Sequence, residues 1–155
     1  MKKITVLMAA LFALSAPVAS FAAMDHGSMG MGHGQQGDVA HEEVVNGVKA
    51  TFKVMSMKEH MKAMKMEMPK GVKETHHVAV EFKDAKTGKA LTEGDVKVKV
   101  MNNTDKTEQT KDLMAMEGHF GADFEMSKKG KYGVMSKFQL KDGKVRNAKF
   151  WYTVK

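Results

Sequence analysis

Apolar and polar residues alternate along most of the chain after residue 44. Val78, Val80 and Phe82 share one face of an extended stretch, and the valines between residues 96 and 100 repeat the pattern. Because successive side chains of a strand point to opposite sides, this alternation predicts strands with one buried face. The predicted strands cover residues 44–55, with an interruption, and then 76–84, 96–100, 107–114, 120–126, 131–140 and 145–154.

Turn residues separate the predicted strands. Asn46-Gly47 interrupts the first stretch, and Asp142-Gly143 is the strongest hairpin signal in the chain. Seven short strands at this spacing predict an all-β fold, an antiparallel immunoglobulin-like β-sandwich of about seven strands. A small barrel is the alternative.

One stretch departs from the β pattern. Residues 57–68, MKEHMKAMKMEM, contain no β-branched residue and are followed by Pro69-Lys70-Gly71. Good helix formers before such a stop predict a short helical insert across one edge of the sandwich. A strand is the alternative, since methionines also alternate here. On a helix, one narrow stripe would contain Met57, Met61, Met64 and Met68, with His60 on its flank.

The N-terminus is typical of an export signal. Lys2 and Lys3 precede an apolar run, and Ser20 and Ala22 have the small side chains that signal peptidase prefers. We therefore expect a signal peptide at 1–22, a flexible tail rich in Met, His and Gly at 23–41, and a β-domain at 42–155. The mature protein would be periplasmic and would not span the membrane, because the apolar run is short; a retained anchor is the alternative.

Charge and composition exclude several functions. The formal charge is +7, but only one residue is arginine and the lysines mostly alternate with apolar residues, so we expect no nucleic-acid partner. The chain contains no cysteine, which removes disulfides and a thiol nucleophile. It also lacks G-x-S-x-G and H-E-x-x-H motifs, and we expect no enzymatic activity.

Soft metal donors are abundant. The chain has 16 methionines and 7 histidines, and thioether and imidazole ligands suit copper, above all Cu(I), with Cu(II) or Ag(I) as alternatives. The tail contains a first group of candidate ligands: Met24, His26, Met29, Met31 and His33. A floppy segment with these donors could collect a soft ion, whereas an inert linker would have no packing reason to contain them.

The predicted domain contains two further groups of candidate ligands. The first is the Met57–Met68 stripe with His60, and it could equally be a buried helix face. The second consists of Met114, Met116 and His119 near a turn, together with His76. His76 and His77 are adjacent in a strand and point to opposite faces, so only one of them can face a given site. A solvent-exposed or hydrogen-bonded role is the alternative for these histidines.

The second half of the chain resembles a known family. The segments HHVAVEFKDAKTGKAL, MAMEGHF, KKGKYGVMSKFQL and FWYTV are similar to those of the YtkA-like family of small exported bacterial domains. The resemblance implies an immunoglobulin-like sandwich found near copper or heavy-metal handling systems and similar in architecture to CopC-like copper carriers. Members often carry a Met-x-x-Met-x-His type cluster, which the segment from Met114 to His119 matches in part.

Two classes of function therefore remain from the sequence. The first is a periplasmic copper chaperone or buffer that passes its ion to the periplasmic face of a metal-efflux or oxidase-assembly complex. The second is a metal-free interaction module that docks on such a complex and uses methionine as an adaptable contact surface.

Overall fold

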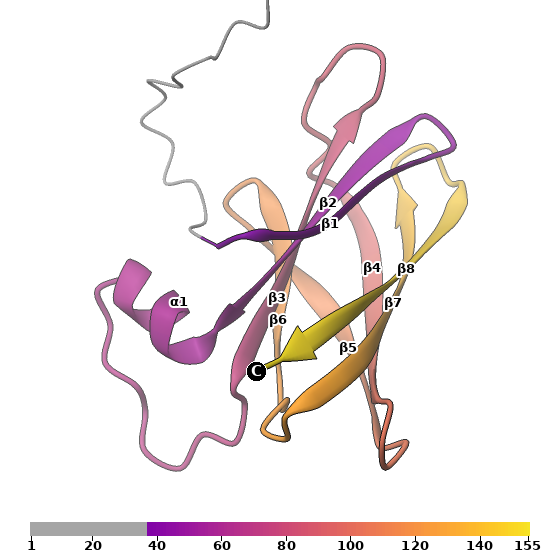
Figure 1. Cartoon of the computed structure of the whole chain (residues 1–155). Coiled ribbons are helices and arrows are strands. Elements are labelled where there is room, and N and C mark those ends of the chain that lie inside the picture. Colours follow the sequence, from indigo (N-terminus) through magenta and orange to yellow (C-terminus); the bar gives the residue numbers. More distant parts are fainter. Residues whose placement is uncertain (1–36) are drawn as a thin grey trace, which may run out of the picture. The chain divides into compact units, whose positions relative to one another are not determined.

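Eight strands and one short helix form residues 37–155, the part of the chain that this computed structural model describes (Figure 1). The predicted signal peptide and most of the predicted tail lie outside these residues. The first strand begins at Val39, within the segment assigned to the tail. The elements are β1 (Val39–Val45), β2 (Val48–Ser56), α1 (Met57–Ala63), β3 (His76–Asp84), β4 (Gly94–Asn102), β5 (Glu108–Met116), β6 (His119–Phe124), β7 (Gly130–Leu140) and β8 (Val145–Val154).

The strand count corrects the expected seven. Asn46 and Gly47 both have positive φ, 45° and 78°, and join β1 to β2 as a tight hairpin. Both central residues of this turn type need positive φ, which Asn and Gly tolerate best. The interruption in the first predicted strand is therefore a complete reversal, and it makes two strands from one.

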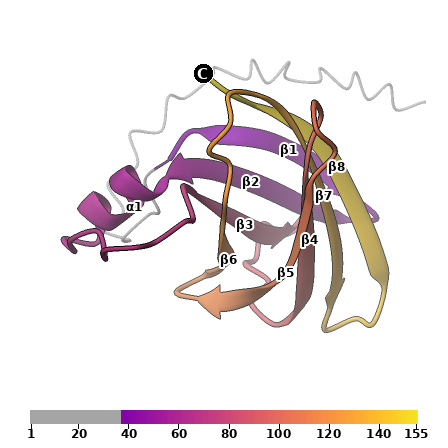
Figure 2. The same cartoon turned by 90° about the horizontal axis from the view of Figure 1, so that it is seen from below.

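All strand pairs are antiparallel, and the strands follow the order β1-β2-β3-β6-β5-β4-β7-β8 in one sheet. The sheet curves until it is nearly a barrel, and the expected sandwich is not confirmed (Figure 2). At the seam between β1 and β8, His41 stacks on Phe150 with ring centroids 5.1 Å apart. Arg146 of β8 also donates to the main-chain carbonyls of Val45 and Asn46. Side chains therefore join the two end strands.

The interior of this curved sheet is filled by apolar side chains from seven strands. Phe52, Phe82, Phe120 and Phe138 are at most 2% exposed, and the β-branched valines of β3 and β4 pack around them. These are the alternate positions that the sequence pattern marked as buried. The residues between them face outward, and those positions carry the polar side chains and the candidate site.

The helix α1 is shorter than the predicted 57–68. Ser56 and Glu59 form a reciprocal capping box at its start. At its end, the amide of Met66 donates to the carbonyl of Met61, and Lys65 adopts a φ of 55°. This hydrogen bond and left-handed residue are those of a Schellman stop. The helix therefore ends at Ala63, five residues before the expected end.

Because α1 packs on the outer face of β2 and β3, it creates a second buried layer outside the main core. Met55, Met57, Met61 and Ala79 are each at most 7% exposed and belong to this layer. His77 lies among them. None of the helices that the structure describes is long and apolar enough to cross a membrane.

Candidate metal centre

Four adjacent strands and α1 bring candidate ligands together on the outer face of the sheet. Met55 of β2 pairs with His77 of β3, which in turn pairs with Asp123 of β6. On β5, Met116 pairs with His119 of β6. Paired residues of antiparallel strands point to the same face, so these side chains share the surface that α1 partly covers.

His77 is the most deeply buried polar residue of this surface, with 1% of its area exposed. Its Nδ1 lies 2.6 Å from Oδ1 of Asp123. A carboxylate accepts a hydrogen bond, so it favours the tautomer with the proton on Nδ1. The other nitrogen, Nε2, is buried and has no hydrogen-bond partner. A metal ligand requires a free lone pair, and Nε2 of this buried, oriented imidazole has one.

His119 presents a second nitrogen of the same kind. Its Nε2 is buried and has no hydrogen-bond partner, while its Nδ1 is 3.4 Å from the carbonyl oxygen of Glu117. The rings of His77 and His119 are edge to face, with centroids 6.5 Å apart and an interplanar angle of 85°. Leaving a buried polar atom unpaired costs about 1–3 kcal/mol, so two such atoms on neighbouring rings make His77 and His119 candidate ligands.

His60 of α1 lies flat against His77. The ring centroids are 3.9 Å apart and the rings are within 6° of parallel. The lone pairs of an imidazole lie in the ring plane, so one ion cannot lie in the planes of two stacked rings. In this arrangement His60 therefore covers His77, and it does not share an ion with it.

Gly121 leaves space beside the histidines, and Met116 occupies part of it. A Cβ on Gly121 would lie 2.6 Å from Nε2 of His77 and 3.6 Å from Sδ of Met116. The thioether sulfur and the unpaired nitrogen therefore both face Gly121. Met114 pairs with Gly121 on the same face and is 70% exposed, so it is the most accessible donor near this site.

Burial favours the neutral imidazole of His60 and of His119. Desolvation lowers the pKa of His60 below its ordinary value of 6.5, and the nearby His77 lowers it further. Burial also lowers the pKa of His119. Only a neutral imidazole can bind a metal, so the shift of His119 extends ligation by that residue to lower pH.

The donor set fits a soft ion of low coordination number. Within residues 37–155, no three His, Asp or Glu side chains converge on a common point. The arrangement is instead two imidazole nitrogens and a thioether, which suits Cu(I) or Ag(I) better than a hard ion. Metal–nitrogen bonds of about 2 Å would require the two rings to lie slightly closer than their present 6.5 Å.

The other predicted ligands lie elsewhere. Met57 and Met61 are on the buried face of α1 itself, whereas Met64 and Met68, which follow the helix, are 49% and 44% exposed. His76 points away from the cluster, where its Nδ1 lies 2.8 Å from Oγ1 of Thr75 and its ring meets Tyr152 edge-on. The candidates in the tail lie outside the described residues: Met24, His26, Met29, Met31 and His33.

His77 and Asp123 are the residues that sequence reasoning did not select. Alternation in β3 could have identified His77, because Val78 and Val80 face the core and residues of the other parity face outward. The same parity places His119 and Asp123 together on β6. The remaining information, that β3 and β6 are neighbours, comes only from the sheet order.

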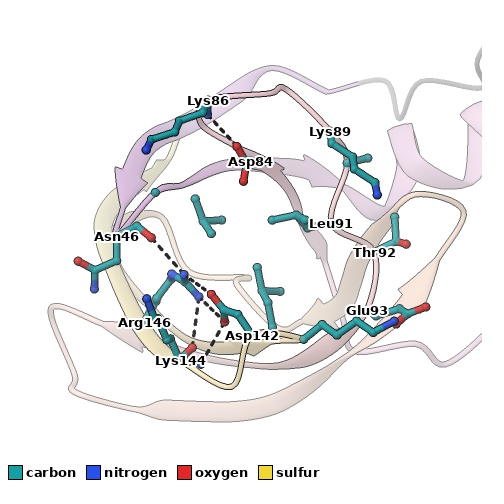
Figure 3. A pocket seen from close by; sticks show the side chains of 15 residues that line it. Asn46, Asp84, Lys86, Lys89, Leu91, Thr92, Glu93, Asp142, Lys144 and Arg146 are labelled. Carbon is teal, nitrogen blue, oxygen red and sulfur yellow. Dashed lines mark hydrogen bonds and ion pairs between the residues drawn. The ribbon is translucent and has the colours of Figure 1, made fainter.

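A cavity of about 510 Å³ lies at the opposite end of β3, and its lining carries several charged residues (Figure 3). Arg146 lies there, 3% exposed, with a bidentate ion pair to Asp142 and further hydrogen bonds to main-chain carbonyls. These contacts use every N–H of the guanidinium. Arg146 therefore fixes the seam of the sheet and has no donor left for a ligand.

The fold and site describe a small antiparallel β-protein with a His/Met cluster on its outer face. No protein-family model matches the chain, and no curated protein matches it. Among solved structures, it is similar to FetP of a uropathogenic E. coli strain, at 13% identity and a TM-score of 0.58, over 75% of this chain and 93% of that one. A copper-bound variant of FetP has the same identity and TM-score, over 73% and 93%.

A copper-bound variant of Campylobacter jejuni P19 is also similar, at 14% identity and a TM-score of 0.58, over 75% of this chain and 95% of that one. At this identity the likeness establishes the fold. The expected membership of the YtkA-like family finds no match among family models.

Proposed function

We propose that this chain is a periplasmic copper-binding protein, a chaperone or buffer that holds Cu(I) through His77, His119 and Met116. The observation that carries the proposal is the pair of buried Nε2 atoms without partners, next to a thioether. A buried imidazole with a purely structural role would have hydrogen bonds at both ring nitrogens. Neither His77 nor His119 has this complete set.

Similar structures support the choice of metal. FetP and P19 variants of this fold were solved with copper bound. The chemistry of the donors points to the same ion, since thioether sulfur is a soft ligand and the chain has no cysteine to compete with it. Cu(I) and Ag(I) accept two or three ligands, whereas Cu(II) prefers a tetragonal set that two imidazoles and one thioether do not complete.

Asp123 has a defined part in this site. Its carboxylate accepts the Nδ1 proton of His77 in a hydrogen bond, which leaves the electron pair of Nε2 available to a metal. The exposed donors would bring the ion to the site: Met114 on β5, Met64 and Met68 after α1, and the Met and His residues of the tail. Delivery to an efflux or oxidase-assembly complex would follow, and the protein would act as a carrier and not as an enzyme.

The test is Cu(I) affinity of the mature full-length protein, measured under anaerobic reductant by competition with a chromophoric chelator. His77→Ala and His119→Ala should each weaken the tightest site about 100-fold or more, and Asp123→Ala about 10–100-fold. Met116→Leu removes the thioether of the proposed site. Met135→Leu is its matched control, because Met135 is half-buried on the far side of the sheet. Wild-type affinity in both histidine variants would refute the site.

A further variant separates the domain from the tail. Replacing the five Met and His residues between 24 and 33 should lower the number of ions bound and leave the tightest affinity unchanged. Loss of the tightest site in this variant, with the histidine variants unaffected, would place copper in the tail and contradict the domain site.

A further inference from the structure

A separate surface lies on the outer face of β4, β7 and β8, across the sheet order from the histidine cluster. Strand register places lysines side by side here: Lys99, Met135 and Lys149 form one row across the three strands, and Lys97, Lys137 and Asn147 form the next. A shallow groove of about 460 Å³ runs among them. We call this surface the basic face; it comprises Lys97, Lys99, Lys131, Lys137, Lys149 and Trp151.

Most of the positive charge of the basic face is uncompensated. Lys97 pairs with Asp112 at 3.4 Å, and Lys99 pairs with Glu108 at 3.3 Å. Within the described part of the chain, the other three lysines of the basic face have no carboxylate partner. Alternation along a half-buried strand explains why lysines face outward, but it does not explain why so few acids lie between them.

Trp151 adds an exposed aromatic ring to this charge. It is the single tryptophan of the chain and is 44% exposed. The ring lies across Gly133, with Cζ3 3.2 Å from the position that a Cβ on Gly133 would take. The ammonium groups of Lys131 and Lys149 lie 5.4 and 5.5 Å from the ring centre. An indole fixed flat between two lysines presents an amphipathic surface.

We propose that the basic face docks peripherally on an anionic phospholipid surface. Tryptophan is enriched at the level of lipid headgroups, and clustered lysines are attracted to anionic lipid without needing defined partners. An acidic protein is the competing occupant, but protein interfaces favour Arg and are depleted in Lys, and every cation here is Lys. The exposed aromatic ring between the lysines also suits a layer of lipid headgroups.

The test uses the full-length mature protein with vesicles of phosphatidylglycerol and phosphatidylcholine, and with phosphatidylcholine vesicles as the neutral surface. Binding is followed by co-sedimentation and by the fluorescence of Trp151, which reports on this face alone. We expect binding to the anionic vesicles with a blue shift, no binding to the neutral ones, and release at roughly 1 M salt, where charges are screened.

Charge reversal locates the surface. Each lysine near an anionic surface contributes about fivefold to binding, so Lys137→Glu with Lys149→Glu should lower the partition coefficient about 25-fold or more. The matched control, Lys86→Glu with Lys89→Glu, changes the net charge equally in the exposed loop after β3 and should leave most of the binding intact. Circular dichroism of both variants verifies the fold.

Three outcomes would overturn the proposal. They are the absence of binding to anionic vesicles, an equal loss in the two double variants, or a Trp151 signal that responds to soluble polyglutamate but not to vesicles. The last would assign the basic face to an acidic polypeptide.

Discussion

Replacement of Gly121 by alanine tests whether His77 is held as rigidly as the structure shows. The new Cβ would lie 2.6 Å from Nε2 and 2.8 Å from Cε1 of His77, closer than non-bonded atoms allow. The ring cannot retreat easily, because His60 stacks on it and Asp123 holds its other edge. Overpacking of this kind costs about 1–3 kcal/mol.

Two effects oppose each other in this variant. Alanine in a strand is favoured over glycine by about 0.5–1 kcal/mol, since glycine loses more backbone freedom on folding. The net expectation for Gly121→Ala is therefore a loss of about 0.5–2 kcal/mol in the free energy of unfolding. In a His77→Ala background the clash is absent, and the same change should stabilise the protein by about 0.5–1 kcal/mol.

Urea denaturation of the wild type, both single variants and the double variant gives the coupling energy directly. We expect about 1–3 kcal/mol between the two positions. Gly121→Ala should also weaken Cu(I) binding, because Nε2 of His77 is displaced or covered. An equal cost of Gly121→Ala in both backgrounds would show that the ring of His77 does not lie above Gly121, and the reasoning about the site would fail.

Three further predictions concern stability. Arg146→Leu removes the donors to several main-chain carbonyls at the seam and should cost about 3 kcal/mol, measured by urea denaturation; a cost below about 0.5 kcal/mol would mean that water replaces the guanidinium freely. Lys65→Gly relieves a left-handed residue and should stabilise the metal-free protein by about 0.5–1 kcal/mol in the same assay, whereas destabilisation would contradict the assigned helix end. Burial holds the pKa of His60 and of His119 below 6.5 in the folded state, so the unfolded chain binds protons before the folded protein does as pH falls. The stability that depends on these neutral histidines is therefore complete above about pH 6.5 and is lost progressively below it. Thermal denaturation of the metal-free protein should therefore give a lower Tm at pH 5 than at pH 7.5, and replacing both histidines by Gln should reduce that difference; an unchanged difference would assign the effect to other groups.

The alternating pattern predicted the β-class and most strand positions, because one buried face imposes a period of two on each strand. It did not predict the division of the first strand, although Asn46-Gly47 carried the signal of a hairpin. The helix was expected at the right start and ends early, because a hydrogen-bonded stop at Lys65 precedes Pro69. Helical periodicity continues past this point in the sequence, so composition alone could not locate the end.

The candidate site was predictable in its chemistry and only in part in its membership. Met116, His60 and His119 were identified by residue type, and all three lie at the cluster. His77 and Asp123 meet across two strands that are far apart in the chain, so no local spacing could pair them. The role of His60 as a cover depends on a ring orientation that sequence does not encode.

The contact of Arg146 with Val45 has a consequence for the order of assembly. It joins residues 101 positions apart, and the stacking of His41 on Phe150 spans a similar distance. Loop closure of this length is slow, and neither contact can form until the whole chain is available. A polypeptide emerging from its N-terminus can therefore pair β1 with β2 early, but it cannot close the sheet between β1 and β8 until the last strand arrives.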